Sequence, residues 1–228
     1  MDWQALALTL RLAALTTVLL LVIAIPVASW IIFTRSRLRA LVEAITTLPL
    51  LLPPTVLGFY LLVLLGPRTA FGRAWIHLTG HPLAFSFAGL VAGSVIYSLP
   101  FAVQPVVAGF AGVDAALIEQ AQLLGAGRWR MLRELLLPLS TRSVITAAVL
   151  CFTHTIGEFG VVLMIGGDIP GSTRTLSISI FDQVQDFNYA AANRTALVLV
   201  TVSVATLAAL YLLRGPAALS VSGEPRRG

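Results

Sequence analysis

One acidic residue, Glu158, lies deep inside an apolar stretch of the sequence, and His154 precedes it by about one helical turn. A carboxyl group inside a membrane is costly, so Glu158 should face a bundle interior or a water-filled path. It is either a gate residue that hydrogen-bonds across a dimer interface or a residue whose hydrogen bonds fix helix packing. Binding an anion is its weakest role, because a carboxylate repels negative charge. We expect His154 to be a hydrogen-bond partner rather than a proton relay.

Other reactive patterns are weak. His77 and His81 have the i, i+4 spacing of a helical metal pair, but Gly80 and Pro82 interrupt the helix and no third ligand is evident. We therefore expect no metal site. All fifteen basic residues are Arg, which excludes a Walker A lysine and a Schiff-base lysine. No catalytic triad or carboxylate pair is legible within one segment. We expect no enzymatic activity and no directly bound cofactor, so ATP-Mg would bind a separate subunit.

The composition is that of a membrane protein. Hydrophobic residues make up 57% and charged residues 11% of the 228 residues, with a mean hydropathy of +0.91. Soluble domains carry about 25% charged residues. A membrane-spanning helix needs about 20 apolar residues. We predict an all-α polytopic bundle in one domain, residues 1–228, with a core at about 5–213 and five spans at about 12–33, 44–66, 86–109, 143–165 and 195–213.

Two details refine the predicted spans. Residues 1–11 should form an interfacial lead-in to the first span. The run 74–113 could hold an additional span, but Gly80-His81-Pro82 is a turn signal, so we expect a short external helix at about 73–78 and a span starting near Ala84. Prolines remove backbone hydrogen bonds. Kinks are therefore expected at Pro26, Pro53-Pro54, Pro100 and Pro105.

Arginines are distributed unevenly between the two sides of this topology. Segments 34–43, 110–142 and 214–228 share one side and carry ten arginines: Arg35, Arg37, Arg39, Arg128, Arg130, Arg133, Arg142, Arg214, Arg226 and Arg227. The other side carries four: Arg68, Arg73, Arg174 and Arg194. Because cytoplasmic loops accumulate basic residues, the N-terminus should lie outside and the C-terminus in the cytoplasm. The net charge of +5 thus reflects topology, and we expect no nucleic-acid binding.

The polar loop 112–138 is predicted to be an L-shaped pair of helices. Asp114 suits an N-cap and Gly125 a C-terminal stop, which predicts a helix over 115–124. A second short helix should begin at Arg128, pair Arg130 with Glu134, and end before Pro138. Such a helix with an apolar face can insert into a groove of a partner. The alternative is a loop that only lies on the membrane surface.

Several motifs resemble a known transporter family. Glu119-Gln120-Ala121, Gly125 and Leu137-Pro138 resemble the coupling motif of ABC-importer permeases, from which Gln120 departs because that family has Ala there. Residues 51–60, 123–130, 156–160 and 169–175 resemble the molybdate permeases in particular, over about residues 5–213. The first and third of these segments recur in sulfate and tungstate permeases. The external sequence Ile169-Pro-Gly-Ser-Thr-Arg-Thr175 favours molybdate.

This resemblance implies the fold of a type I ABC importer permease and the import of an oxyanion, molybdate, by alternating access. Sulfate or tungstate is the alternative substrate. An ATP-independent channel or secondary carrier and an intramembrane enzyme are the alternatives from other classes. The implied partners are a second copy of the chain, two cytoplasmic ATPase subunits and an external oxyanion-binding protein, at a bacterial inner membrane.

The resemblance also implies three sets of site residues. The surface that couples to the ATPase comprises Asp114, Glu119, Gln120, Ala121, Gly125, Gly127, Arg128, Leu137 and Pro138. The gate and pathway candidates are Pro53, Pro54, Thr55, His154, Glu158 and Phe159. The external residues that could dock the binding protein are Arg68, Arg73, Arg174 and Arg194, although each could equally be a solvated rim charge.

Overall fold

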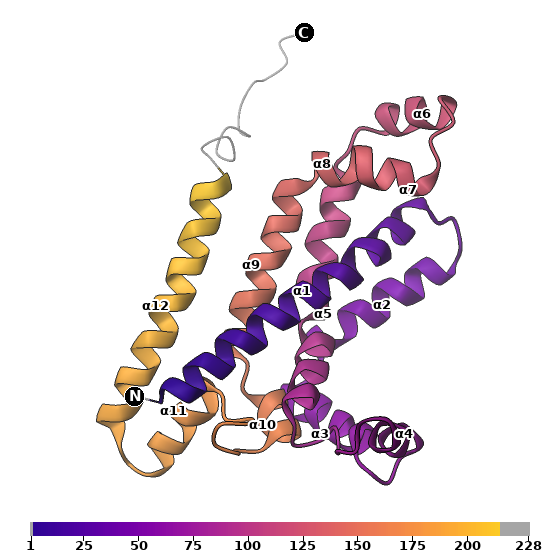
Figure 1. The fold of residues 1–228 in the computed structure, drawn as a ribbon. Coiled ribbons are helices and arrows are strands. Elements are labelled where there is room, and N and C mark those ends of the chain that lie inside the picture. The colour runs from indigo at the N-terminus through magenta and orange to yellow at the C-terminus, as the bar shows by residue number, and fades with distance from the viewer. Residues whose placement is uncertain (1, 215–228) are drawn as a thin grey trace.

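The computed structural model describes residues 2–214, and within this range every regular element is a helix. The elements are α1 (Trp3–Phe33), α2 (Leu38–Leu51), α3 (Pro54–Leu65), α4 (Ala70–Thr79), α5 (Phe87–Ala111), α6 (Ala115–Leu123), α7 (Arg128–Met131), the π-helical turn η1 (Leu132–Leu136), α8 (Leu137–Leu139), α9 (Thr141–Gly157), α10 (Gly160–Gly166), α11 (Leu176–Gln185) and α12 (Tyr189–Arg214) (Figure 1). The predicted all-α fold class is confirmed.

Helices α1, α5 and α9 pack against one another and form the centre of the bundle (Figure 1). Their shared core contains Ala24 and Ala28 of α1, Val106 and Phe110 of α5, and Ala147 of α9, all fully buried. Small side chains such as these alanines let helices approach closely. The three helices are therefore the frame on which the other elements are placed.

Three helices, α1, α5 and α12, are each long and apolar enough to cross a membrane. Two further pairs pass the same test only as bent units: α2 with α3, at 113°, and the segment Arg128–Leu139 with α9, at 77°. Counting each bent pair once gives up to five spans, the predicted number. The second and fourth predicted spans are nevertheless wrong as continuous helices.

The breaks in those two spans lie at identifiable residues. Leu52 lies between α2 and α3 with an extended backbone, as expected before Pro53, whose ring disfavours a helical residue in front of it. The fourth predicted span is interrupted at Glu158 and Phe159, between the end of α9 and the start of α10. By contrast, Pro26 lies within the continuous helix α1.

Helix α1 includes the residues predicted as a lead-in to the first span. It begins at Trp3, with the Asp2 side chain accepting a hydrogen bond from the Ala5 backbone N–H at 2.9 Å. The described part of residues 1–11 is thus helical and continuous with the span. The short helix predicted at about 73–78 is present and is slightly longer, as α4.

The elements divide between two ends of the bundle (Figure 1). The start of α1 lies with α3, α4, α10 and α11 at one end, whereas α6, α7 and α8 lie at the other, toward which α12 runs. This is the grouping that the alternation of loops predicts. Arg226 and Arg227, which contribute to the predicted charge asymmetry, lie outside the described residues.

Candidate functional site

The two helix breaks meet around an open hollow of about 540 Å³. Its lining brings together predicted gate residues from distant parts of the sequence and several residues that were not predicted: Pro54, Thr55, Tyr97, Thr153, His154, Gly157, Glu158, Phe159 and Gly160. Of the predicted gate residues, only Pro53 is not part of this lining; it is exposed and precedes α3. A hollow formed at interrupted helices, with polar groups such as Glu158 and His154 in its lining, is the kind of place where a membrane bundle can hold water or a polar solute.

Close contact between α3 and α10 shapes this hollow. A Cβ atom on Gly160 would lie 2.7 Å from Pro54 Cβ, closer than carbon atoms can approach. A Cβ atom on Gly58, one turn further along α3, would likewise lie 2.8 Å from Met164 Cβ. Glycine is therefore required for the start of α10 to rest against the start of α3.

Glu158 is buried at this junction, with 4% of its surface exposed. Neither carboxyl oxygen meets the geometry of a hydrogen bond with any group among residues 2–214, although the equally unpartnered hydroxyl of Ser94 on α5 is near enough to interact with it. Its backbone carbonyl, in contrast, accepts a hydrogen bond from Ser177 Oγ at 2.5 Å. A buried polar group without a partner is costly, so the carboxyl group is suited to bond with a group that enters the hollow or comes from another chain.

His154 lines the same hollow but does not bond to Glu158. Its Nδ1 lies 2.9 Å from Ser98 Oγ on α5. Its ring stacks on Phe101 at a centroid distance of 4.1 Å and lies against Tyr97 at 4.9 Å. His154 therefore serves as a hydrogen-bond partner between α9 and α5.

The sequence interpretation missed Tyr97, Thr153, Gly157 and Gly160. The two glycines flank Glu158 and could have been found, because adjacent glycines near a lone acidic residue suggest an interrupted helix. Tyr97 and Thr153 lie in apolar runs with no periodic signal that separates a lining position from a packing position. Only the arrangement of the helices identifies them.

The opposite end of the molecule carries a projecting arm made of α6, α7, η1 and α8. Asp114 caps α6 by accepting a hydrogen bond from Ala116 N–H at 2.9 Å, as predicted. Gly125 ends it with φ +78°, and the Ala126 N–H reaches back to the Ala121 carbonyl at 2.9 Å. This left-handed stop is the one predicted from Gly125.

The second half of the arm differs from its prediction in one respect. The expected pair of Arg130 and Glu134 is present at 2.8 Å. The helix does not end before Pro138, however, but continues through it to Leu139. A π-helical turn, Leu132–Leu136, precedes the proline and accommodates its missing N–H and bulky ring.

The arm is anchored at one side and exposed at the other. Met131, Leu132 and Leu136 are buried in the bundle, whereas α6 has no buried residue. Leu123 and Leu124 are 88% and 86% exposed. The predicted coupling residues Glu119, Gln120, Gly125, Gly127, Arg128 and Pro138 are also exposed, while Ala121 and Leu137 are half-buried. An apolar, solvent-facing helix on a rigid base is suited to enter a groove of a partner protein.

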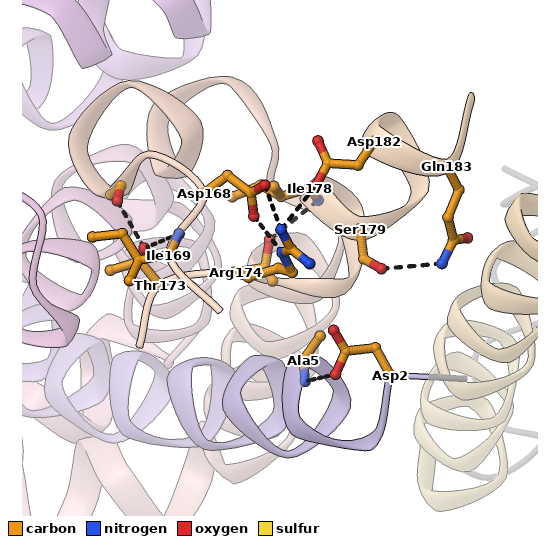
Figure 2. Close-up of polar contacts among 12 residues, drawn as sticks. Asp2, Ala5, Asp168, Ile169, Thr173, Arg174, Ile178, Ser179, Asp182 and Gln183 are labelled. Carbon is orange, nitrogen blue, oxygen red and sulfur yellow. Dashed lines mark hydrogen bonds and ion pairs between the residues drawn. The ribbon is translucent and has the colours of Figure 1, made fainter. Parts of the chain in front are cut away.

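At the end of the bundle opposite the arm, Arg174 forms an ion-pair cluster (Figure 2). It bonds Asp168 through Nε and through Nη2, the latter at 2.7 Å, and lies 3.6 Å from Asp182. The hydrogen bond from Arg174 lowers the pKa of Asp168. Burial, followed by the neighbouring Asp168, raises the pKa of Asp182 to about 6. Asp168 raises the pKa of Arg174 in turn, so this guanidinium is engaged within the chain.

The other three arginines predicted to dock a partner, Arg68, Arg73 and Arg194, are exposed. Arg73 Nη1 donates to the Arg68 carbonyl at 2.9 Å, and Arg194 Nε donates to the Ala190 carbonyl at 3.2 Å. None of the three has a carboxylate within ion-pair distance in the described part of the chain. They can pair with an external partner more readily than Arg174 can.

Comparison with known proteins identifies the family. The model of the family described as binding-protein-dependent transport system inner membrane component matches residues 20–214. The chain belongs to this family. It is a multi-pass inner-membrane permease subunit of an ABC importer and not an enzyme.

Individual relatives agree with this membership. The permease is 51% identical over 213 residues to the molybdenum transport system permease protein ModB of Azotobacter vinelandii, covering 93% of this chain and 94% of the relative. It is 35% identical to ModB of Escherichia coli K12 over 184 residues, 81% and 80% of the two chains. It is also 31% identical to the sulfate transport system permease protein CysT of that strain, over 82% and 67%.

Solved structures agree on the fold. A bacterial alginate ABC transporter in complex with an alginate-bound periplasmic protein has a chain that superposes with a TM-score of 0.76 at 18% identity, covering 97% of the permease and 80% of that chain. Another structure, of a bacterial ABC transporter that imports alginate, gives 0.71 at 18% identity, over 96% and 79%. These similarities establish the fold of an ABC importer permease.

Proposed function

We propose that this permease moves molybdate from an external binding protein into the cytoplasm, as a homodimer driven by two ATPase subunits. The observation that carries the substrate assignment is the 51% identity to a molybdenum permease over nearly the full length of both chains. Sulfate is the second candidate, supported by the weaker similarity to a sulfate permease. Tungstate remains a further candidate by its chemical likeness to molybdate.

The proposed coupling surface is the exposed side of the arm. Closure of the ATPase pair would pull α6, whose apolar tip at Leu123 and Leu124 would lie in a groove of the ATPase. The pull would pass through η1 and α8 into α9, because Leu132 and Leu136 are buried against the bundle. Helix α9 ends at Gly157, beside the hollow, so movement of the arm would change the gate.

The proposed path runs through the hollow at the two helix breaks. The hollow is open on one side in a single chain, and a symmetric second copy would supply the facing wall. Glu158 would then hydrogen-bond across the interface when the path is shut, which would satisfy its buried oxygens. The alternative is that Glu158 fixes only the packing of its own chain, through the nearby Ser94 hydroxyl on α5.

The proposed orientation places α4 and α11 outside and the arm in the cytoplasm, in line with the excess of arginine on the arm side. Arg68, Arg73 and Arg194 would then face the binding protein. Because that protein would hold the substrate, the permease need not carry a tight site of its own.

Uptake of labelled molybdate tests the substrate. The permease would be reconstituted in proteoliposomes with its ATPase subunits and a molybdate-loaded binding protein. We expect ATP-dependent uptake that excess tungstate competes with more strongly than excess sulfate. Uptake that persists without ATP would indicate a channel or carrier, and stronger competition by sulfate would reassign the substrate.

Gly125→Asp tests the coupling surface. Gly125 has φ +78°, and left-handed backbone costs a residue with a side chain about 1–2 kcal/mol, while the added carboxylate disturbs the docking surface. We expect membrane insertion to be retained and ATPase stimulation by the loaded binding protein to be lost. Gly112→Asp is the matched control, because Gly112 is exposed with φ −80°. Normal uptake by Gly125→Asp would contradict the coupling role.

A further inference from the structure

Two adjoining grooves flank Trp30 at the end of α1. One, of about 290 Å³, lies between α1 and the arm and is lined mainly by Pro26, Trp30, Phe33, Arg128, Trp129 and Leu132. The other, of about 320 Å³, continues past Pro26 and Trp30 to Val27 and Val42 of α2. Together they form a shallow, mostly apolar channel along the last two turns of α1, which we name the Trp30 groove.

The Trp30 groove lies at the depth of a membrane interface. Helix α1 has 31 residues and is therefore about 46 Å long at ~1.5 Å per residue, more than the ~30 Å of a hydrocarbon core. Its final turns thus reach the headgroup region. Trp30 and Trp129 are 37% and 69% exposed there, and tryptophan is enriched at this level of a bilayer.

The charge at the mouth of the groove is positive. Arg128 is exposed and has no carboxylate within ion-pair distance in the described part of the chain. Arg35 and Arg37 follow Phe33 in the turn to α2 and are likewise exposed without such a partner among residues 2–214. By contrast, Arg39 and Arg130 are neutralised by Glu43 at 2.9 Å and Glu134 at 2.8 Å. Arg128, the one arginine in the described lining of the groove, is therefore unneutralised.

We propose that the Trp30 groove binds an anionic phospholipid of the cytoplasmic leaflet. The headgroup phosphate lies on Arg128, and an acyl chain lies against Pro26, Trp30 and Phe33. A lipid matches both features of the groove: its charge complements the arginines and its chain complements the apolar lining. This inference rests on the orientation stated under the proposed function.

Such a lipid would add a second contact between two parts of the permease that already share a core at Ile31, Leu132 and Leu136. Trp30 and Phe33 belong to the transmembrane frame, whereas Arg128 and Trp129 belong to the arm. Occupancy of the groove would hold the start of α7 against α1. Anionic lipid would therefore stiffen the base of the arm and strengthen coupling.

Fluorescence quenching by brominated lipids tests the proposal on the purified full-length permease without its ATPase. The probes are phosphatidylglycerol and phosphatidylcholine with identical brominated acyl chains, added at increasing mole fraction. Comparison with Trp30→Phe isolates the signal of Trp30 from those of Trp3, Trp75 and Trp129. We expect brominated phosphatidylglycerol to quench Trp30 at a lower mole fraction than brominated phosphatidylcholine does.

Arg128→Gln should raise the mole fraction of phosphatidylglycerol needed for half quenching by about fivefold, the effect of one arginine near an anionic surface. Arg142→Gln is the matched control and should leave it unchanged, because Arg142 is exposed but does not line the groove. Equal quenching by both lipids, or an unchanged preference in Arg128→Gln, overturns the proposal. So does protection of Trp30 from both lipids, since a second copy then covers the groove. These outcomes do not depend on molybdate uptake, which is measured separately.

Discussion

The hydroxyl of Thr9, on the first helix, accepts a hydrogen bond from the backbone N–H of Leu176 at 2.9 Å. Leu176 is the first residue of α11, so its N–H has no partner within its own helix. Both residues are buried. Next to it, Ser177 Oγ bonds the Glu158 carbonyl at 2.5 Å. The start of α11 therefore ties α1 to the break between α9 and α10, where the hollow lies.

Thr9→Val should destabilise the permease. Valine has the same shape but cannot accept the hydrogen bond, so the buried Leu176 N–H loses its partner, at a cost of about 1–3 kcal/mol. The measurement is the thermal midpoint of the purified protein in detergent. Thr201→Val is the matched control, because Thr201 is exposed and its hydroxyl bonds only the Leu197 carbonyl of its own helix. Equal midpoints for the two variants would show that the Thr9 bond contributes little.

Local patterns in the sequence predicted local structure well. Asp114 and Gly125 gave the bounds of α6 to within one residue, because capping depends on neighbours a few positions away. Glu158 was correctly expected to face the interior or a path rather than lipid, because a lone acid in an apolar run has few other places to go.

Contacts between distant residues could not be predicted in this way. The partner of His154 is Ser98, 56 residues earlier, and the partner of Leu176 is Thr9, 167 residues earlier. Serine and threonine within apolar helices carry no signal that distinguishes these roles from a bond to their own helix. The breaks at Leu52 and Glu158 were also underestimated, because hydropathy measures apolar length and not helical continuity.

Gly160→Ala should disrupt the lip of the hollow. The added methyl group would lie 2.7 Å from Pro54 Cβ, and the rigid proline ring cannot turn aside. Separating α3 from α10 should cost about 1–3 kcal/mol, as overpacking does elsewhere. The thermal midpoint should fall, and transport per folded molecule should change with it.

Gly157→Ala is the control for this prediction. Gly157 also lines the hollow, three residues earlier, but no atom lies within 4 Å of a Cβ placed there. We expect a thermal midpoint close to that of the wild type. If both alanine variants behave alike, the close approach of α10 to Pro54 is not what shapes the hollow.

The ion-pair cluster around Arg174 should make stability depend on pH. The pKa of Asp182 is raised to about 6, from about 3.9 in an unfolded chain, so the folded protein binds a proton more tightly. Stability from this group is therefore greatest at low pH and is lost as pH rises from about 4 to about 6. The pKa of Asp168 is lowered, so its contribution is lost only below about 4.

Asp182→Asn should remove this dependence. Thermal midpoints of both proteins would be measured from pH 4.5 to pH 7.5. The midpoint of the variant minus that of the wild type should increase as pH rises to about 6. The contributions of titrating groups outside this cluster cancel in this difference. Asp186→Asn is the control and should keep most of the wild-type dependence, because Asp186 has the smallest of the effects that raise the pKa of Asp182. A constant difference between Asp182→Asn and the wild type would contradict the prediction.

Glu158→Gln distinguishes a gate residue from a packing residue. Glutamine has nearly the same shape, and its side-chain oxygen can still accept a hydrogen bond from the nearby Ser94 hydroxyl. Folding and the thermal midpoint should therefore be retained. If the carboxyl group bonds across the dimer when the path is shut, molybdate uptake per folded molecule should change by about tenfold, the effect of losing a charged hydrogen bond.

Glu43→Gln is the control, because Glu43 pairs with Arg39 away from the hollow, and its uptake should match the wild type. A Glu158→Gln protein that is less stable but transports normally per folded molecule would assign Glu158 to packing.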